Sequence, residues 1–252
     1  MQSLQIDRRY CSPNFDDRPP GSTIDMLVLH YTAVDFERSI EILCDPHNPL
    51  GRVSAHYVID LDGRIYQLVD DQNRAWHAGK SAWRGRTSLN GSSIGIEVVN
   101  PGHDVTPRVP YREAQIESII ALSRGLIERY SIPAHNIVGH SDIAPTRKSD
   151  PGEHFPWQRL AEAGVGLQTT MITPQADAML RLPDLIEAQA LLAKIGYQVP
   201  QTGILCAHTE AVVRAFQMRF VQNAVSGALC EQTLKTLPRI ASSFPQDATV
   251  LA

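Results

Sequence analysis

The segment Met26–Tyr31, MLVLHY, constrains the fold of this chain more than any other stretch. It is apolar on both faces, as expected for a central strand in a sheet that is covered on both sides. His30 stands at the end of this strand, where a histidine is costly unless it is hydrogen-bonded or bound to a metal. A core histidine with satisfied hydrogen bonds and a metal ligand are both consistent with this position.

Segments after this strand alternate between strand and helix patterns. The predicted strands are 53–59, 65–69, 93–99 and 137–140, the first two forming a β-hairpin with Gly63 in its turn. The predicted helices, with apolar residues at helical spacing, are 35–44, 111–130 and 156–164. Residues 1–25 show no period and are predicted to be an arm leading into the first strand. We therefore expect an α/β domain with a central β-sheet and polar residues along one sheet edge.

Several potential ligands fall within one short segment, 139–152, which reads GHSDIAPTRKSDPG. His140 and Asp150 are of residue types that bind zinc. Pro151 favours extended backbone before it, so Lys148 and Asp150 are predicted to face one cavity while Ser149 faces away. The alternative is a solvated polar loop in which the histidine and the aspartate cap turns. Eight of the nine histidines precede residue 155, which assigns any metal chemistry to the first part of the chain.

Glu97 is a charged residue in an otherwise apolar strand pattern. It lies in the predicted strand 93–99, on the same face as Gly95 and Val99, between apolar neighbours. An unpaired charge buried in a central strand is costly, and Gly95 leaves room beside it. We therefore interpret Glu97 as a functional residue.

A long polar loop, residues 73–93, follows the hairpin. It carries aromatic residues interleaved with arginine and asparagine, which suits a wall that binds a sugar or a peptide. The candidates for substrate contact are Trp76, His77, Trp83, Arg86 and Asn90, together with His56 in the hairpin. The alternative is a loop held in place by two half-buried tryptophans.

The last third of the chain reads as a separate unit. A linker is predicted at 168–180, after a first domain of residues 1–167. Residues 181–252 then contain a helix capped by Asp184, a second capped by Thr209 and a third near 231–237. The pattern G-x-L-C-x-x-T occurs twice, at 203–209 and 227–233. A compact three-helix bundle of this kind fits a small binding module, or a structural tail that covers the first domain.

Composition narrows the possible classes of protein. The chain is 43% hydrophobic and 20% charged, which is ordinary for a globular protein, and its net charge of −4 does not suggest a nucleic-acid surface. No apolar run approaches the ~18 residues that span a bilayer. The N-terminus lacks the apolar core of a signal peptide. The four cysteines have no C-x-x-C spacing, so a cysteine-only zinc site is not expected.

Six motifs in order resemble the zinc-dependent N-acetylmuramoyl-L-alanine amidases of the type-2 family, whose fold is shared with peptidoglycan recognition proteins. They are LHYT at 29–32, SAHY at 54–57, RAWHAG at 74–79, SIGIE at 93–97, GHSDIAP at 139–145 and KSDPG at 148–152. The tail resembles a three-helix peptidoglycan-binding module, but has Cys206 and Cys230 where that module commonly has aspartate. The resemblance implies a central mixed β-sheet flanked by helices, followed by a small all-α domain.

The resemblance also implies roles for individual residues. His30, His140 and Asp150 would bind one Zn²⁺ per chain, leaving a fourth position for water, as in catalytic zinc sites. Glu97 would be the general base, and Lys148 would stabilise the oxyanion. The implied reaction is hydrolysis of the amide between N-acetylmuramic acid and L-alanine in peptidoglycan or muropeptides.

Two alternatives to this wall amidase remain. One is a recognition protein that has the fold without turnover, although this chain retains all three ligands, Glu97 and Lys148. The other is a cytoplasmic amidase that recycles soluble anhydro-muropeptides. The wall-binding tail favours a periplasmic or envelope location, whereas the N-terminal sequence favours the cytoplasm. The preference between intact and anhydro sugars, the length of the stem peptide, the oligomeric state and the pairing of Cys206 with Cys230 are left open.

Overall fold

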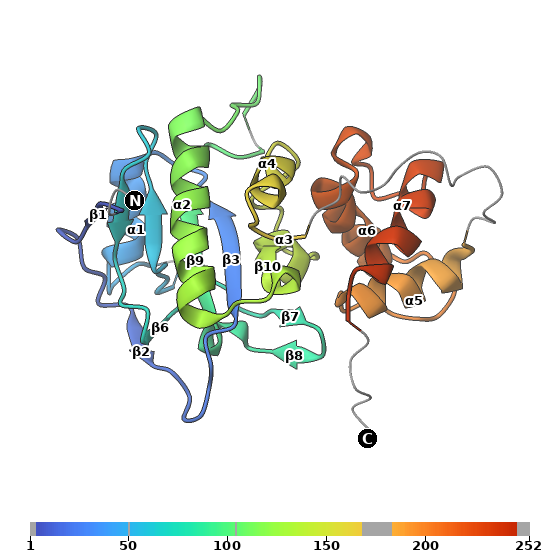
Figure 1. Cartoon of the computed structure of the whole chain (residues 1–252), viewed down its shortest axis with the longest axis horizontal. Helices are drawn as coiled ribbons and strands as arrows, with labels where there is room; N and C mark the ends of the chain where they lie inside the picture. The colour runs from blue at the N-terminus through green and yellow to red at the C-terminus, as the bar shows by residue number, and fades with distance from the viewer. Residues whose placement is uncertain (1–3, 50, 104, 168–182, 246–252) are drawn as a thin grey trace.

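A computed structural model describes residues 4–49, 51–103, 105–167 and 183–245 of the chain (Figure 1). The first part is an α/β domain and the last is a group of helices packed against its side. The linker predicted at 168–180 and the end of the tail after 245 lie outside the described residues. In the part of the chain that is described, no helix combines the length and apolarity needed to cross a membrane.

A six-stranded mixed sheet forms the centre of the first domain, in the order β1-β5-β4-β9-β3-β10. Its strands are β1 (Ile6–Asp7), β3 (Met26–Tyr31), β4 (Tyr57–Ile59), β5 (Ile65–Gln67), β9 (Ser93–Val98) and β10 (Ile137–Gly139). The strand β3 lies between β9 and β10 and is parallel to both, while β4 and β5 are antiparallel to each other. This confirms the mixed sheet, the hairpin and the central place of Met26–Tyr31.

Helices cover both faces of the sheet, which explains the unbroken apolar run of β3. Leu27 and Leu29 pack with residues of α2 (Glu113–Tyr130) and α4 (Trp157–Glu162). Met26 and Val28 point into a different cluster, which continues into the C-terminal helices. Farther along the sheet, α1 (Phe36–Cys44) covers β4 and β5, and Asp35 caps its first turn.

Short elements appear where the sequence predicted irregular chain. The N-terminal arm contributes β1 and also β2 (Phe15–Asp17), which pairs with β6 (Asn73–Ala75). The predicted loop 73–93 contains β6, the small hairpin of β7 (Ala82–Trp83) and β8 (Arg86–Thr87), and a 3₁₀ turn, η1 (Leu89–Gly91). A second 3₁₀ turn, η2 (Ala134–Asn136), precedes β10, and the short helix α3 (His140–Ile143) follows it directly. Strands of two or three residues are too short to leave a period in the sequence.

The tail contains the three predicted helices, α5 (Leu185–Ile195), α6 (Ala207–Phe220) and α7 (Glu231–Ser242), with a 3₁₀ turn, η4 (Gln222–Ala224). Asp184 caps α5 as predicted. The helix α6, however, begins after Cys206 and not at Thr209, whose buried side chain binds Gln189 instead. The helix α7 also continues five residues beyond its predicted end at 237.

The repeated G-x-L-C-x-x-T pattern is a structural repeat. Gln189 of α5 accepts a hydrogen bond from the Gly203 amide and donates to the carbonyl of Ile204. Gln217 of α6 makes the same pair of bonds with Gly227 and Ala228. Each glutamine thereby fixes the turn that starts the next helix. Cys206 and Cys230 occupy the N-cap positions of α6 and α7 without a side-chain cap hydrogen bond, and both are free thiols.

The tail and the first domain share one hydrophobic core. Trp83 is fully buried and packs edge-on against Tyr197 and Phe244 of the tail. The amide of Arg84 donates to the carbonyl of Gly196. The same cluster joins Val138 and Ile143 of the first domain to apolar residues of all three tail helices. The tail is therefore docked through apolar packing; whether residues 181–252 also fold alone stays a prediction.

Candidate metal centre and catalytic cleft

Three neighbouring parallel strands bring the principal residues to one edge of the sheet. His30 is the fifth residue of β3, and its register partner on β9 is Glu97. On the other side of β3, β10 ends at Gly139, so His140 follows at the same edge as the first residue of α3. Asp150 comes from the loop after α3, whose Ser141 amide donates to the Asp150 carbonyl. Strand pairing thus brings His30 close to His140, which lies 110 positions away, and the loop after α3 adds Asp150.

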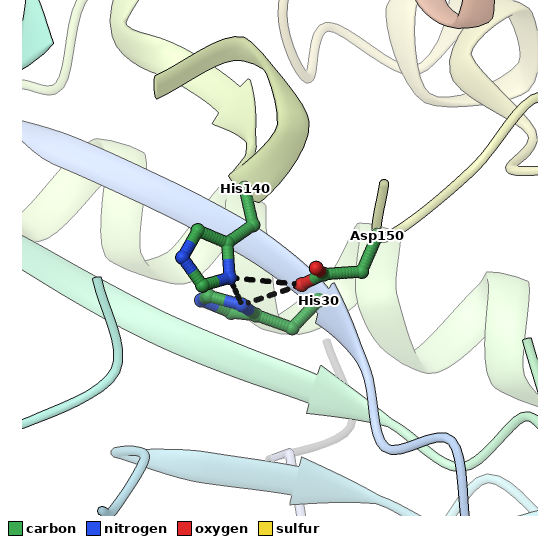
Figure 2. Close-up of side chains that lie close together, drawn as sticks. All are labelled: His30, His140 and Asp150. Atoms are coloured by element: carbon green, nitrogen blue, oxygen red, sulfur yellow. Dashed lines mark hydrogen bonds and ion pairs between the residues drawn. The ribbon is translucent and has the colours of Figure 1, made fainter. Parts of the chain in front are cut away.

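His30, His140 and Asp150 form a buried cluster able to hold a metal ion (Figure 2). The two Nδ1 atoms are 3.0 Å apart, and they lie 2.9 and 3.1 Å from Asp150 Oδ2. Two imidazole nitrogens and one carboxylate oxygen are the donor set of catalytic zinc sites. Ligands about 2.1 Å from a tetrahedral zinc lie about 3.4 Å from one another, close to the spacing found here. The cluster therefore fits a zinc ion.

Hydrogen bonds on the far side of each imidazole leave the Nδ1 lone pairs for a metal. His140 Nε2 donates to the Ala78 carbonyl at 3.2 Å. His30 Nε2 donates to His77 Nδ1 at 3.1 Å, and His77 Nε2 lies 3.2 Å from Ser93 Oγ. Partners of this kind fix the tautomer and the ring orientation of a metal-binding histidine.

The protonation states also suit metal binding. Burial, together with the nearby His140, lowers the pKa of His30 to about 4, so His30 is neutral at pH 7. Burial acts to raise the pKa of Asp150, but its electrostatic interactions and hydrogen bonds with His140 and His30 outweigh burial, so the pKa is lowered. The site thus presents a neutral imidazole and an ionised carboxylate.

A cavity of about 340 Å³ opens beside the cluster, and Glu97 and Lys148 both line it. Burial raises the pKa of Glu97 well above its usual value; the charge of Asp150 adds to this and Lys148 opposes it. Glu97 Oε2 is buried without a hydrogen-bond partner among the described residues. A raised pKa makes the carboxylate a stronger proton acceptor, which suits a general base.

Only part of the predicted substrate wall reaches the cavity. Trp76 and His77 line it, and Trp76 stacks under Arg52 with 5.0 Å between the guanidinium and the ring centre. His77 is buried beside His30, and the hydrogen bond between them holds the His30 imidazole in place. Ser149 borders the cavity as well, so the prediction that it faces away is wrong.

The other four candidates have structural contacts elsewhere. Trp83 is fully buried under the tail, which does not fit substrate contact. Arg86 pairs with Asp25, and the side chain of Asn90 accepts hydrogen bonds from the amides of His77 and Ala78. His56 lies below the site, where its Nδ1 accepts from the Gly95 amide and its Nε2 contacts the Asn73 carbonyl. Among the described residues, none of the four lines the cavity.

Sequence reasoning missed Tyr31 and Arg147, which also line the cavity. Arg147 donates to the carbonyls of Ala78 and Lys80 and so ties the ligand loop to the loop at 78–80. The signal available in the sequence was their position, since Tyr31 follows the candidate ligand His30 and Arg147 precedes Lys148.

A family model described as N-acetylmuramoyl-L-alanine amidase matches residues 20–153, which is more than half of the chain and contains all five of the ligand and catalytic candidates. The chain belongs to the N-acetylmuramoyl-L-alanine amidase family. In this amidase a second model, a peptidoglycan binding domain, matches residues 181–237, which form most of the tail.

Two curated relatives of this amidase match it over regions of different length. N-acetylmuramoyl-L-alanine amidase AmiD of Escherichia coli is 38% identical over 239 residues, covering 89% of this chain and 84% of the relative. 1,6-Anhydro-N-acetylmuramyl-L-alanine amidase AmpD of the same organism is 39% identical over 167 residues, covering 60% of this chain and 88% of the relative. The similarity to AmiD thus extends over most of the chain.

Solved structures give the same picture. The complex of E. coli AmiD with anhydro-N-acetylmuramic acid-L-Ala-D-γ-Glu-L-Lys matches with a TM-score of 0.79 at 35% identity, over 93% of this chain and 99% of that one. The AmpDh3 structure from Pseudomonas aeruginosa matches with a TM-score of 0.74 at 35% identity, over 97% and 100% of the two chains. The likeness therefore includes the C-terminal helices as well as the sheet.

Proposed function

We propose that this amidase is a zinc hydrolase that cuts the amide between the lactyl group of N-acetylmuramic acid and L-alanine. The observation that carries the proposal is the convergence of His30, His140 and Asp150 beside a cavity that Glu97 and Lys148 also line. Family membership supports the same reaction. A recognition protein without turnover would not need this set complete.

Zinc held by the two histidines and the aspartate would polarise the amide carbonyl and lower the pKa of water from about 16 towards about 7. The residues of the chain supply the remaining chemistry. Glu97 accepts the proton of the attacking water and passes it to the nitrogen of the leaving L-alanine, as its raised pKa allows. Lys148, at the exposed side of the cavity, places a positive charge where the oxyanion develops. Trp76 and Tyr31 offer aromatic surface for the substrate.

We further propose that the substrates include both the wall polymer and soluble anhydro-muropeptides. The likeness of the tail to a peptidoglycan binding domain supports the polymer, because a second attachment point raises the effective concentration of the enzyme on it. It also supports action in the cell envelope. The solved AmiD complex, with its anhydro-sugar substrate, supports the soluble class.

Two digests test the function. The protein is incubated with purified sacculi and, separately, with soluble anhydro-muropeptides, and the products are identified by mass spectrometry. We expect peptides with a free L-alanine amino group and glycan fragments that have lost their peptides. Sacculus binding without release of peptide, from zinc-loaded protein, would indicate a recognition protein. Metal analysis of protein purified without chelator should give one zinc per chain.

A further inference from the structure

A buried ionic contact joins the tail to the metal-site helix. Arg219 of α6 is only 5% exposed, and its Nη1 donates to Asp142 Oδ2 at 2.9 Å. Its Nη2 donates to the Ile137 carbonyl at 2.6 Å, and its guanidinium lies 4.8 Å from the centre of the Trp157 ring. One arginine of the tail therefore binds β10, α3 and the region of α4 together.

Tyr197, between α5 and α6, completes the contact. Its hydroxyl donates to Asp142 Oδ1 at 2.5 Å, and the residue is 3% exposed. Both carboxylate oxygens of Asp142, itself 1% exposed, are thus bonded to tail residues. A carboxylate so deeply buried is stable only while such partners are present.

Asp142 is coupled to the metal ligands through the backbone of α3. Its Oδ2 also accepts from the Gly139 amide at 2.8 Å, which caps the helix directly before His140. Two residues on, the Ser141 amide donates to the Asp150 carbonyl at 2.8 Å. The position of Asp142 therefore helps set the backbone that carries both His140 and Asp150.

Apolar residues around this contact pack β10 and α3 against the tail. Val138 and Ile143 lie in the hydrophobic cluster that contains residues of α5, α6 and α7. Figure 1 shows β10, the edge strand of the main sheet, and α3 between β3 and α6. The segment that delivers His140 is thus supported on one side by the first domain and on the other by the tail.

We infer that Arg219 and Tyr197 are positioning residues for the metal ligand His140, acting through Asp142. On this account the peptidoglycan-binding-like tail completes the metal centre in addition to any role in holding the polymer. The inference rests on the proposed function, because it takes His140 to be a metal ligand.

Conservative substitutions in the full-length protein test the inference. Arg219→Gln removes the charge but keeps much of the length, and Tyr197→Phe removes one hydroxyl. Arg214→Gln is the matched control, because Arg214 lies on the same helix but is exposed, and it donates to the Ser226 carbonyl within the tail. Zinc affinity is measured by competition with a chromogenic chelator, and the absorption spectrum of the Co²⁺-substituted protein reports ligand geometry.

We expect Arg219→Gln to weaken zinc binding by about tenfold, the lower end of the effect of residues that orient a metal ligand. Tyr197→Phe should weaken it about threefold, the effect of one hydrogen bond. Both should alter the Co²⁺ spectrum and speed amide exchange at Gly139 and Ser141, while Arg214→Gln matches the wild type.

The outcomes separate the two claims. Wild-type protein that binds no zinc would remove the proposed function. Wild-type protein that binds zinc, with both variants equal to it in affinity, Co²⁺ spectrum and amide exchange, would overturn the inference alone. If Arg219→Gln does not fold, Tyr197→Phe decides the test, and unchanged zinc affinity in that variant overturns the inference.

Discussion

Gly95→Ala is a small change with a large expected effect. A Cβ built on Gly95 would lie 2.4, 2.6 and 2.7 Å from three atoms of the His77 ring, whereas ordinary contacts begin at 3.4 Å. The ring would have to move by about 1 Å to relieve the overlap. His77 Nδ1 accepts a hydrogen bond from His30 Nε2 at 3.1 Å, and a shift of that size takes it out of hydrogen-bond range.

The cost follows from these two effects. Overpacking of a buried site costs about 1–3 kcal/mol, and the lost hydrogen bond adds about 1 kcal/mol. We therefore expect the free energy of unfolding to fall by about 2–4 kcal/mol. Loss of the partner that orients His30 should also weaken zinc binding by about 10- to 100-fold. A glycine in an unobstructed strand would give the opposite sign, since alanine is favoured there by about 0.5–1 kcal/mol.

The assay is urea unfolding of both the metal-free and the zinc-loaded protein, with zinc affinity from chelator competition. Gly125→Ala in α2 is the control, because a Cβ there meets nothing within 4 Å and alanine should stabilise the helix by about 1 kcal/mol. A Gly95→Ala protein as stable as the wild type, with unchanged zinc affinity, would refute the assigned packing of His77 against Gly95.

Four further predictions follow from the same geometry. Glu97→Ala and Lys148→Ala should each retain zinc and fold but lose about 100- to 1000-fold in turnover; metal loss in the Glu97 variant, seen by metal analysis, would make Glu97 a ligand. Chelation should abolish hydrolysis and added zinc should restore it, and activity that survives complete metal removal would contradict a zinc mechanism. His30 and His56 have pKa values lowered to about 4 and about 3 by burial, so the stability they contribute is present above pH 6.5 and is lost as pH falls towards those values. Unfolding free energy should then drop by up to about 1.4 kcal/mol per pH unit for each histidine, a slope that His56→Gln should reduce. A chain ending at Leu167 exposes the shared core, so we expect a lower melting temperature and weaker cleavage of both sacculi and muropeptides; a loss on sacculi alone would mean that the tail is only an anchor.

The local pattern of the sequence determined much of the sheet and of the candidate metal site. Met26–Tyr31 is a central strand as predicted. An unbroken apolar run has no polar face for the solvent, so both faces of the strand must be buried. His30 and Glu97 were recognisable because polar groups in such strands are costly without a role, and the structure places them side by side in register. His140 and Asp150 came from a different signal, two residues of zinc-binding types in one short loop, together with the family resemblance.

Tertiary structure decided which polar residues face the cavity and how the tail is used. The loop at 73–93 has a composition suited to binding, but composition does not say that Trp83 turns inward to Tyr197 while Trp76 reaches the cleft. Arg219 meets Asp142 across 77 positions, and its row of apolar neighbours on α6 predicts burial without naming a partner. Such contacts depend on how separate elements pack, and a local period carries no information about that packing.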